Sequence, residues 1–239
     1  MVALQVPPIP PRAPQQDHIV VLRDAGWADY QRIMEIRGDH SVPRITFLEG
    51  RLEIMSPSQT HESIKSTLGS LVETYCLERG IEFRALGSWT IEDKDVARGV
   101  EPDECYVFSD DPRPTRPELA IEVVWTSGGI DKLEVYRKLD VREVWFWAEG
   151  ALTPYVLRNQ AYVAVPASEV LPGIDLPQLT SFLDRPTTSA AIREYRAALA
   201  KKPRARRPGA PSGRPAGEPP SSASWPLPSS RRPRSPWPR

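Results

Sequence analysis

Residues 118–125 read ELAIEVVW, in which an almost uniformly apolar run follows Glu118 and is interrupted by one acid, Glu122. A short run of this kind, rich in β-branched residues, is typical of a strand at the centre of a sheet with both faces buried. A carboxylate inside such a run is costly to bury without a partner. The sequence therefore predicts a central strand in which something compensates the charge of Glu122.

The residues before this run predict a helix, a hairpin and a second helix. Residues 27–36 place apolar side chains on one helical face, with Asp24 as the expected cap. The segments RITFL and RLEIM flank Glu49-Gly50, a turn signal typical of a tight hairpin. Apolar residues then recur at helical spacing from Ile64 to Leu77, and Gly80 is the expected helix stop.

The patterns after Gly80 favour strands, with two further helices. Strands are expected at IEFRAL, SWTIE, PDECYVF, ELAIEVVW and EVWFW, helices at about 130–139 and at AAIREYRAALA, and a further hairpin at TPYVLRN and AYVAVP. We interpret LPGIDLPQL as a proline-punctuated closing segment. This order of elements predicts an α/β domain with a mixed central sheet flanked by helices and an N-terminal hairpin.

Composition separates the two ends from the body of the chain. The ends are rich in proline, and residues 201–239 carry ten Lys or Arg against one acid, Glu218. We expect a disordered N-terminus at 1–16, one folded domain at 17–200 and a disordered basic tail at 201–239. The tail would attract a polyanion, and its Trp225 and Trp237 could stack on bases, although a solubilising disordered extension is the stronger of the two interpretations.

The cysteines and the apolar pattern favour a cytoplasmic protein. Cys76 and Cys105 offer neither a disulfide framework nor a paired-cysteine zinc motif. The first residues lack the pattern of a signal peptide, and no apolar stretch approaches the roughly 20 residues needed to span a bilayer. We therefore expect no membrane association.

The pair Asp103 and Glu122 is the strongest candidate for chemistry. Asp103 begins one strand pattern and Glu122 lies within the next. Two carboxylates with water and phosphate make the usual Mg²⁺ site, which can activate water and stabilise charge on a phosphate. The alternative, of about equal weight on spacing alone, is that Glu122 pairs with Arg or Lys and Asp103 caps a turn.

An ordered set of motifs resembles the Uma2 family of bacterial endonucleases, which is related to the PD-(D/E)xK restriction-endonuclease-like superfamily. The set comprises LEIMSPSQTH, the helix after His61, Pro102-Asp103, Glu122-Val123, Lys132, Tyr136 and VREVWFW. The resemblance covers roughly residues 25–185, and it implies a restriction-endonuclease-like fold. It also implies a nuclease that uses Mg²⁺ or Mn²⁺ and acts on nucleic acid, with DNA preferred; a homodimer is left open.

The resemblance implies roles for particular residues. Asp103 and Glu122 would be the acidic metal ligands, with the backbone carbonyl of Val123 as a third. The superfamily places a lysine two residues beyond the acid, where this chain has Val124, so Lys132 is the expected replacement. The segment WTSGG also departs from the Ser-Pro-Ser run that is common in the family, which weakens the case for activity more than the case for the fold.

Two further positions have alternative interpretations, and three aromatic residues are expected to pack. The family places an acid near the site at Glu53, which could instead be the outward residue of an alternating strand. His61 could contact phosphate, bind metal or act as a base, or it could cap a helix. Tyr136 shares a helix face with Lys132 and is expected to pack its ring on the sheet. Trp145 and Trp147 are expected to fill the core and surface grooves rather than to stack on bases.

The sequence therefore predicts a metal-dependent endonuclease in which Asp103, Glu122, Lys132, Glu53 and His61 form the site. The alternative is a catalytically inactive nucleic-acid-binding or regulatory module of the same fold, prompted by Val124 and the basic tail. A protein-interaction scaffold is a third hypothesis, and it predicts binding of neither metal nor nucleic acid.

Overall fold

The computed structural model describes residues 16–124 and 129–201. By contacts the chain divides into two units, Met1–Ala205 and Arg206–Arg239, and the second lies outside the described residues. The expectations for 1–16 and 201–239 likewise fall outside them, apart from Gln16 and Lys201. Among the described residues, no helix combines the length and apolarity that crossing a membrane requires.

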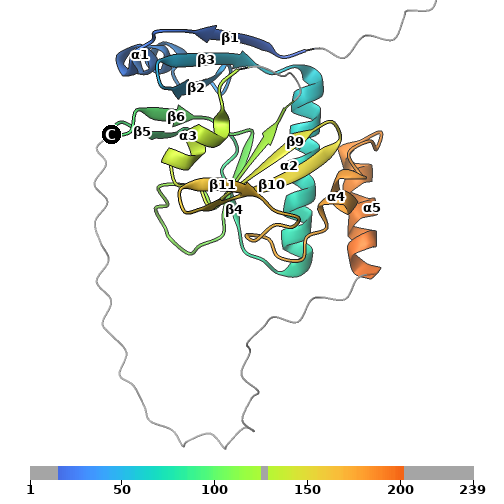
Figure 1. Ribbon diagram of the computed structural model, residues 1–239. Helices are drawn as coiled ribbons and strands as arrows, with labels where there is room; N and C mark the ends of the chain where they lie inside the picture. Colours follow the sequence, from blue (N-terminus) through green and yellow to red (C-terminus); the bar gives the residue numbers. More distant parts are fainter. Residues whose placement is uncertain (1–15, 125–128, 202–239) are drawn as a thin grey trace, which may run out of the picture. The chain divides into compact units, whose positions relative to one another are not determined.

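Five antiparallel strands form the first sheet (Figure 1). Their order is β1 (His18–Leu22), β3 (Arg51–Ser56), β2 (Arg44–Leu48), β6 (Arg98–Val100) and β5 (Ile91–Asp93). The predicted hairpin is β2–β3, and both turn residues, Glu49 and Gly50, have positive φ, as a tight hairpin requires. This sheet packs against α1 (Trp27–Arg37) around the buried Tyr30.

The second sheet is the mixed central sheet that the sequence predicted. Its strands lie in the order β11 (Ala161–Ala164), β10 (Ala151–Arg158), β9 (Glu143–Ala148), β8 (Leu119–Val123), β7 (Glu104–Val107) and β4 (Arg84–Ala85). All neighbours are antiparallel except β8 and β9, which α3 (Lys132–Lys138) connects as a crossover. The apolar run at 118–125 therefore supplies a central strand, as expected.

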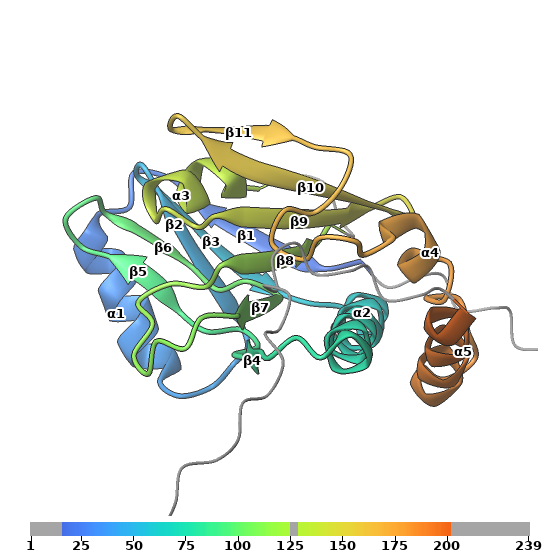
Figure 2. The ribbon, with the colours of Figure 1, turned by 90° about the horizontal axis from the view of Figure 1, so that it is seen from below.

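Helices cover one face of this sheet, and α3 with the first sheet covers the other (Figure 2). The covering helices are α2 (Gln59–Arg79), α4 (Leu176–Thr180) and α5 (Thr188–Lys201). The capping of α2 explains its bounds, because the Ser58 side chain accepts a hydrogen bond from the His61 backbone and Gly80 adopts a left-handed conformation. The expected stop at Gly80 is confirmed.

Several local expectations need correction. Asp24 does not cap α1; Gly26 is the N-cap, and the Asp29 carboxylate accepts its N–H at 2.7 Å. The strands β1 and β6 and the short helix α4 were not predicted, and IEFRAL contributes only the two residues of β4. Short segments such as β6 are held by pairing with distant strands, so local patterning carries little signal for them.

Candidate functional site

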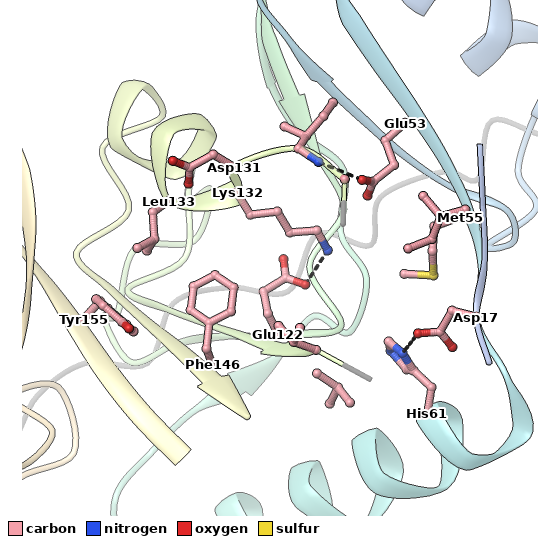
Figure 3. Close-up of a pocket in the computed structure, with 15 residues that line it drawn as sticks. Asp17, Glu53, Met55, His61, Glu122, Asp131, Lys132, Leu133, Phe146 and Tyr155 are labelled. Carbon is pink, nitrogen blue, oxygen red and sulfur yellow. Dashed lines mark hydrogen bonds and ion pairs between the residues drawn. The ribbon is translucent and has the colours of Figure 1, made fainter. Parts of the chain in front are cut away.

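A cavity of about 500 Å³ lies between the first sheet, the helix α3 and the strands β8, β9 and β10 of the second sheet. Its lining includes five residues that the sequence analysis singled out, namely Glu53, His61, Glu122, Val123 and Lys132 (Figure 3). Asp103 does not line the cavity; it is fully buried next to it, where it contacts His61 and the β8 backbone. All six predicted site residues therefore belong to one region, although they come from five parts of the chain.

Glu122 is held by a cation and a hydroxyl. Its side chain is buried on β8, where Lys132 Nζ donates to Oε2 at 2.6 Å and Tyr136 Oη donates to Oε1 at 2.5 Å. Burial raises the pKa of Tyr136 well above its usual value, and the Glu122 charge adds to this, so the phenol stays a donor. Lys132 and Tyr136 are one turn apart on α3, which places both over the same carboxylate.

Asp103 is fully buried, and three residues contact its carboxylate. Its Oδ1 forms an ion pair with Arg44 of β2 and lies 3.0 Å from His61 Nε2. Its Oδ2 accepts the Val123 N–H at 2.6 Å, which fixes it beside the end of β8. Since Glu104 pairs with Ile121, Asp103 and Glu122 are the next residues along two hydrogen-bonded strands.

His61 lies between two carboxylates in the first turn of α2. Its Nδ1 is 3.0 Å from Asp17 Oδ2, and the other oxygen of Asp17 accepts the Ser58 N–H. Burial lowers the pKa of His61, the contact with Asp17 opposes that shift, and the charges of Arg44 and Lys132 add to it. A neutral imidazole has a single N–H and donates it to either Asp17 or Asp103, whereas a protonated ring would donate to both.

Glu53 reaches the cavity from β3. It is buried, and its Oε2 accepts the Ile130 N–H at 2.9 Å, which ties the first sheet to the segment before α3. Gly129 has a φ of +118°, and a Cβ there would lie 2.1 Å from Glu53 Oε2, so glycine permits this approach. Of the two interpretations of Glu53, the outward-facing surface residue is wrong, because the side chain points into the site.

The acidic side chains of the site are the candidate donors for a divalent cation. Within the described residues, no group of three or more His, Cys, Asp and Glu side chains is arranged to hold a metal ion. The acids Asp103 and Glu122 with the Val123 carbonyl are a smaller set, all oxygen, of the kind that binds Mg²⁺ with water and phosphate.

The formal charges also leave room for a cation. Among the described residues, three buried carboxylates (Glu53, Asp103 and Glu122) face two permanent cations, Arg44 and Lys132, which leaves a formal charge of −1. Such an excess is costly in a buried region unless a cation compensates it. The residues thus fit a divalent ion in ligand type and in charge, although Arg44 and Lys132 already contact the two acids.

Sequence reasoning missed Arg44 and Asp17, and it gave Tyr136 a packing role without its hydroxyl contact. Arg44 and Asp103 are far apart in sequence, and neither Arg44 nor Asp17 stands in a recognisable motif. It also missed the half-buried Phe146 and Tyr155, which line the cavity. A signal for Phe146 was present, because it alternates with Trp145 and Trp147 and must point to the opposite face of β9.

This chain was compared with known sequences, structures and families. No curated protein sequence matches the chain. Among solved structures, the chain is similar to a "putative nuclease belonging to DUF820" from Anabaena variabilis ATCC 29413, with 15% identity, 67% of this chain and 96% of that chain covered, and a TM-score of 0.41. The family model Uma2, described as "Putative restriction endonuclease", matches residues 27–186, which is more than half of the sequence. The chain therefore belongs to the Uma2 family.

Proposed function

We propose that this chain is a Mg²⁺- or Mn²⁺-dependent endonuclease that hydrolyses phosphodiester bonds of nucleic acid, DNA in the first place. The observation that carries the proposal is the placement of Lys132 Nζ 2.6 Å from Glu122, with Asp103 buried beside them immediately before the adjoining strand β7. Two acids and a lysine in this arrangement suit phosphoryl chemistry. The description of the Uma2 family supports the same activity.

Each residue has a task that its contacts suggest. Asp103 and Glu122, with the Val123 carbonyl, would hold the ion. When bound, the ion would lower the pKa of an attacking water and offset charge on the phosphate. His61 and Arg44 hold Asp103 in place, and Tyr136 does the same for Glu122. These supporting contacts restrict both acids to one orientation, as a metal ligand requires.

Lys132 occupies the functional place of the superfamily lysine in this proposal. The side chain of Val124, at the usual lysine position, is apolar and 38% exposed at the cavity. Lys132 comes instead from the start of α3, and its ammonium reaches Glu122. From there it can interact with a phosphate oxygen or with water beside the ion, as the same group would from the strand.

The test uses purified protein with single-stranded DNA, duplex DNA and RNA, each with Mg²⁺, Mn²⁺ or a chelator. Asp103→Asn, Glu122→Gln and Lys132→Met keep the approximate size of the side chains while removing their charge. We expect each of the two acid variants to lower the cleavage rate about a thousandfold, because several kcal/mol of charge stabilisation is lost. Lys132→Met is expected to cost roughly a hundredfold.

Glu104→Gln is the matched control. Glu104 is the next residue after Asp103, but its side chain packs on the opposite face of the sheet, against Gly69 of α2. It should cleave at about the wild-type rate. Circular dichroism confirms that every variant is folded. The proposal fails if the wild-type protein cleaves no nucleic acid with either ion, or if the acid variants and the control cleave alike.

A second candidate function is an inactive nucleic-acid-binding module of the same fold. It is favoured by one observation, namely that Asp103 and Glu122 are each already paired with a cation, Arg44 and Lys132. This hypothesis predicts binding that weakens with salt and with truncation after Lys201, and no turnover with any ion. Metal-dependent cleavage that is lost in Glu122→Gln would exclude it.

A further inference from the structure

The cavity has a second end, where two aromatic side chains lie. Phe146 of β9 and Tyr155 of β10 line it together with Leu133 of α3, on the side away from Glu53 and His61 (Figure 3). The two rings meet edge to face, with centroids 5.7 Å apart and planes at 90°. Both aromatic residues are only half buried. The cavity thus combines charged groups with an aromatic wall.

Strand register places this wall directly beside the acids. Glu122 of β8 is paired with Phe146 of β9, and paired residues project from the same face of a sheet. The next strand, β10, contributes Tyr155 on the same side. Asp103, Glu122 and Phe146 therefore lie in register on neighbouring strands, whereas Tyr155 lies on the same face of β10 two residues beyond Thr153, the partner of Phe146. Two acids are thus followed by two aromatic rings along this face. The wall lies one to two strand spacings, roughly 5–10 Å, from Glu122.

The exposure of these rings needs an explanation beyond packing. In the same strand, Trp145 and Trp147 point to the opposite face and are buried in the core. Phe146 and Tyr155 instead retain exposed ring surface within a concave site, where ligands commonly bind aromatic side chains. With the proposed divalent ion held by the acids, a ligand that spans the acids and the rings would combine a flat apolar part with an anionic part, and a nucleotide has both.

We propose that Phe146 and Tyr155 form a subsite for an unpaired nucleobase next to the phosphate that is cleaved. This inference rests on the proposed function and names its substrate class. A base inside a duplex is covered on both faces by its neighbours, so it cannot place a face on a ring within a cavity. The substrate is therefore single-stranded, or it is a duplex with a base that is bulged or turned out of the stack.

The first experiment measures stacking without turnover. A single-stranded DNA that contains one 2-aminopurine is titrated with the protein, with Ca²⁺ in place of Mg²⁺, since Ca²⁺ also takes oxygen ligands. The fluorescence of 2-aminopurine falls when the base stacks, so we expect quenching with the wild-type protein and little with Phe146→Leu or Tyr155→Leu. Tyr155→Phe keeps the ring and should restore quenching.

The matched control is Phe108→Leu. Phe108 is also a half-buried aromatic residue, but it packs against Tyr106 and lies outside this cavity. Its variant should quench as the wild-type protein does. Equal quenching in Phe146→Leu and in the wild type would overturn the subsite, as would an absence of quenching when fluorescence anisotropy shows that the DNA is bound.

The second experiment compares cleavage of one DNA strand alone, in a perfect duplex, and in a duplex with one bulged nucleotide. We expect cleavage of the single strand and of the bulged site, and little cleavage of the perfect duplex. Stacking on an aromatic ring is worth enough that Phe146→Leu should lower kcat/KM on the single strand about 5- to 150-fold.

The outcomes separate the subsite from the activity. Efficient cleavage of the perfect duplex that Phe146→Leu leaves unchanged would overturn the subsite and leave the endonuclease standing. Binding and quenching by the wild-type protein without cleavage under Mg²⁺ or Mn²⁺ would support the subsite and favour the inactive module. A wild-type protein that neither binds nor cleaves any of these substrates would remove both.

Discussion

The two faces of the central sheet differ sharply, although the same strands build them. Toward α2 and α5, β8 and β9 present Ile121, Val123 and Trp145, which are part of the apolar core. Toward α3 and the first sheet, the alternate residues Glu122 and Phe146 face the cavity. Side chains alternate between faces along a strand, so consecutive residues serve stability and the candidate site in turn.

The comparison implies that stability and site chemistry depend on different, alternating residues of the same strands. A substitution on the face toward α2 should lower the free energy of unfolding. The molecules that remain folded should keep the same site geometry. A substitution on the cavity face should change binding or catalysis at a smaller cost in stability. Paired substitutions on the two faces test this separation of stability from site chemistry.

The largest expected effect is that of Trp145→Ala. Trp145 is fully buried, and its indole N–H donates to Glu143, so the substitution removes a large apolar group and one buried hydrogen bond. We expect the free energy of unfolding to fall by about 3–5 kcal/mol. Phe146→Ala, the next residue on the opposite face, should cost roughly 1–2 kcal/mol because its ring is half exposed. Urea denaturation measures both, and equal losses would contradict the comparison.

An intermediate effect is expected for Tyr136→Phe on the cavity face. The hydroxyl donates to the charged, buried Glu122, and a hydrogen bond to a charged group contributes about 1.5–3 kcal/mol. The control is Tyr162→Phe, whose hydroxyl donates to the uncharged Val141 carbonyl and should cost about 0.5–1.5 kcal/mol. If urea denaturation finds Tyr136→Phe no more destabilising than Tyr162→Phe, Glu122 does not depend on this donor.

Local patterns in the sequence predicted the elements that local forces determine. The helix α2, with its Ser58 cap and Gly80 stop, and the β2–β3 hairpin have their signals within a few residues. The strand β8 was predicted from its apolar run, and the helical spacing of Lys132 and Tyr136 placed both on one face. In each case the local sequence pattern matches the structure that forms, so tertiary contacts did not change the local preference.

The remaining site contacts depend on chain segments that are far apart in sequence. Arg44 reaches Asp103, and Asp17 reaches His61, only because β1 and β2 pair with β3 in one register beside the start of α2. Register is set by the burial of a whole strand face, which no local window contains. The family resemblance supplied the predicted site residues, whereas the partners that hold them required the fold.

The smallest expected effect tests the helical cover of the apolar face. Glu73 is half buried on α2, and burial raises the pKa of its carboxyl above the ordinary value of 4.5. Between 4.5 and that higher value the folded chain binds more protons than the unfolded chain, so the free energy of unfolding falls as pH rises through this window. Glu73→Gln cannot ionise and escapes that loss. It should therefore be more stable than the wild type at pH 7, by less than about 1 kcal/mol because solvent screens the group, and no more stable at pH 4.

Urea denaturation at the two pH values measures the difference, with the exposed Glu82→Gln as the control. A gain at pH 4 as large as at pH 7 would mean that the benefit comes from packing of the amide and not from the charge, and that the helical cover tolerates a carboxylate without cost.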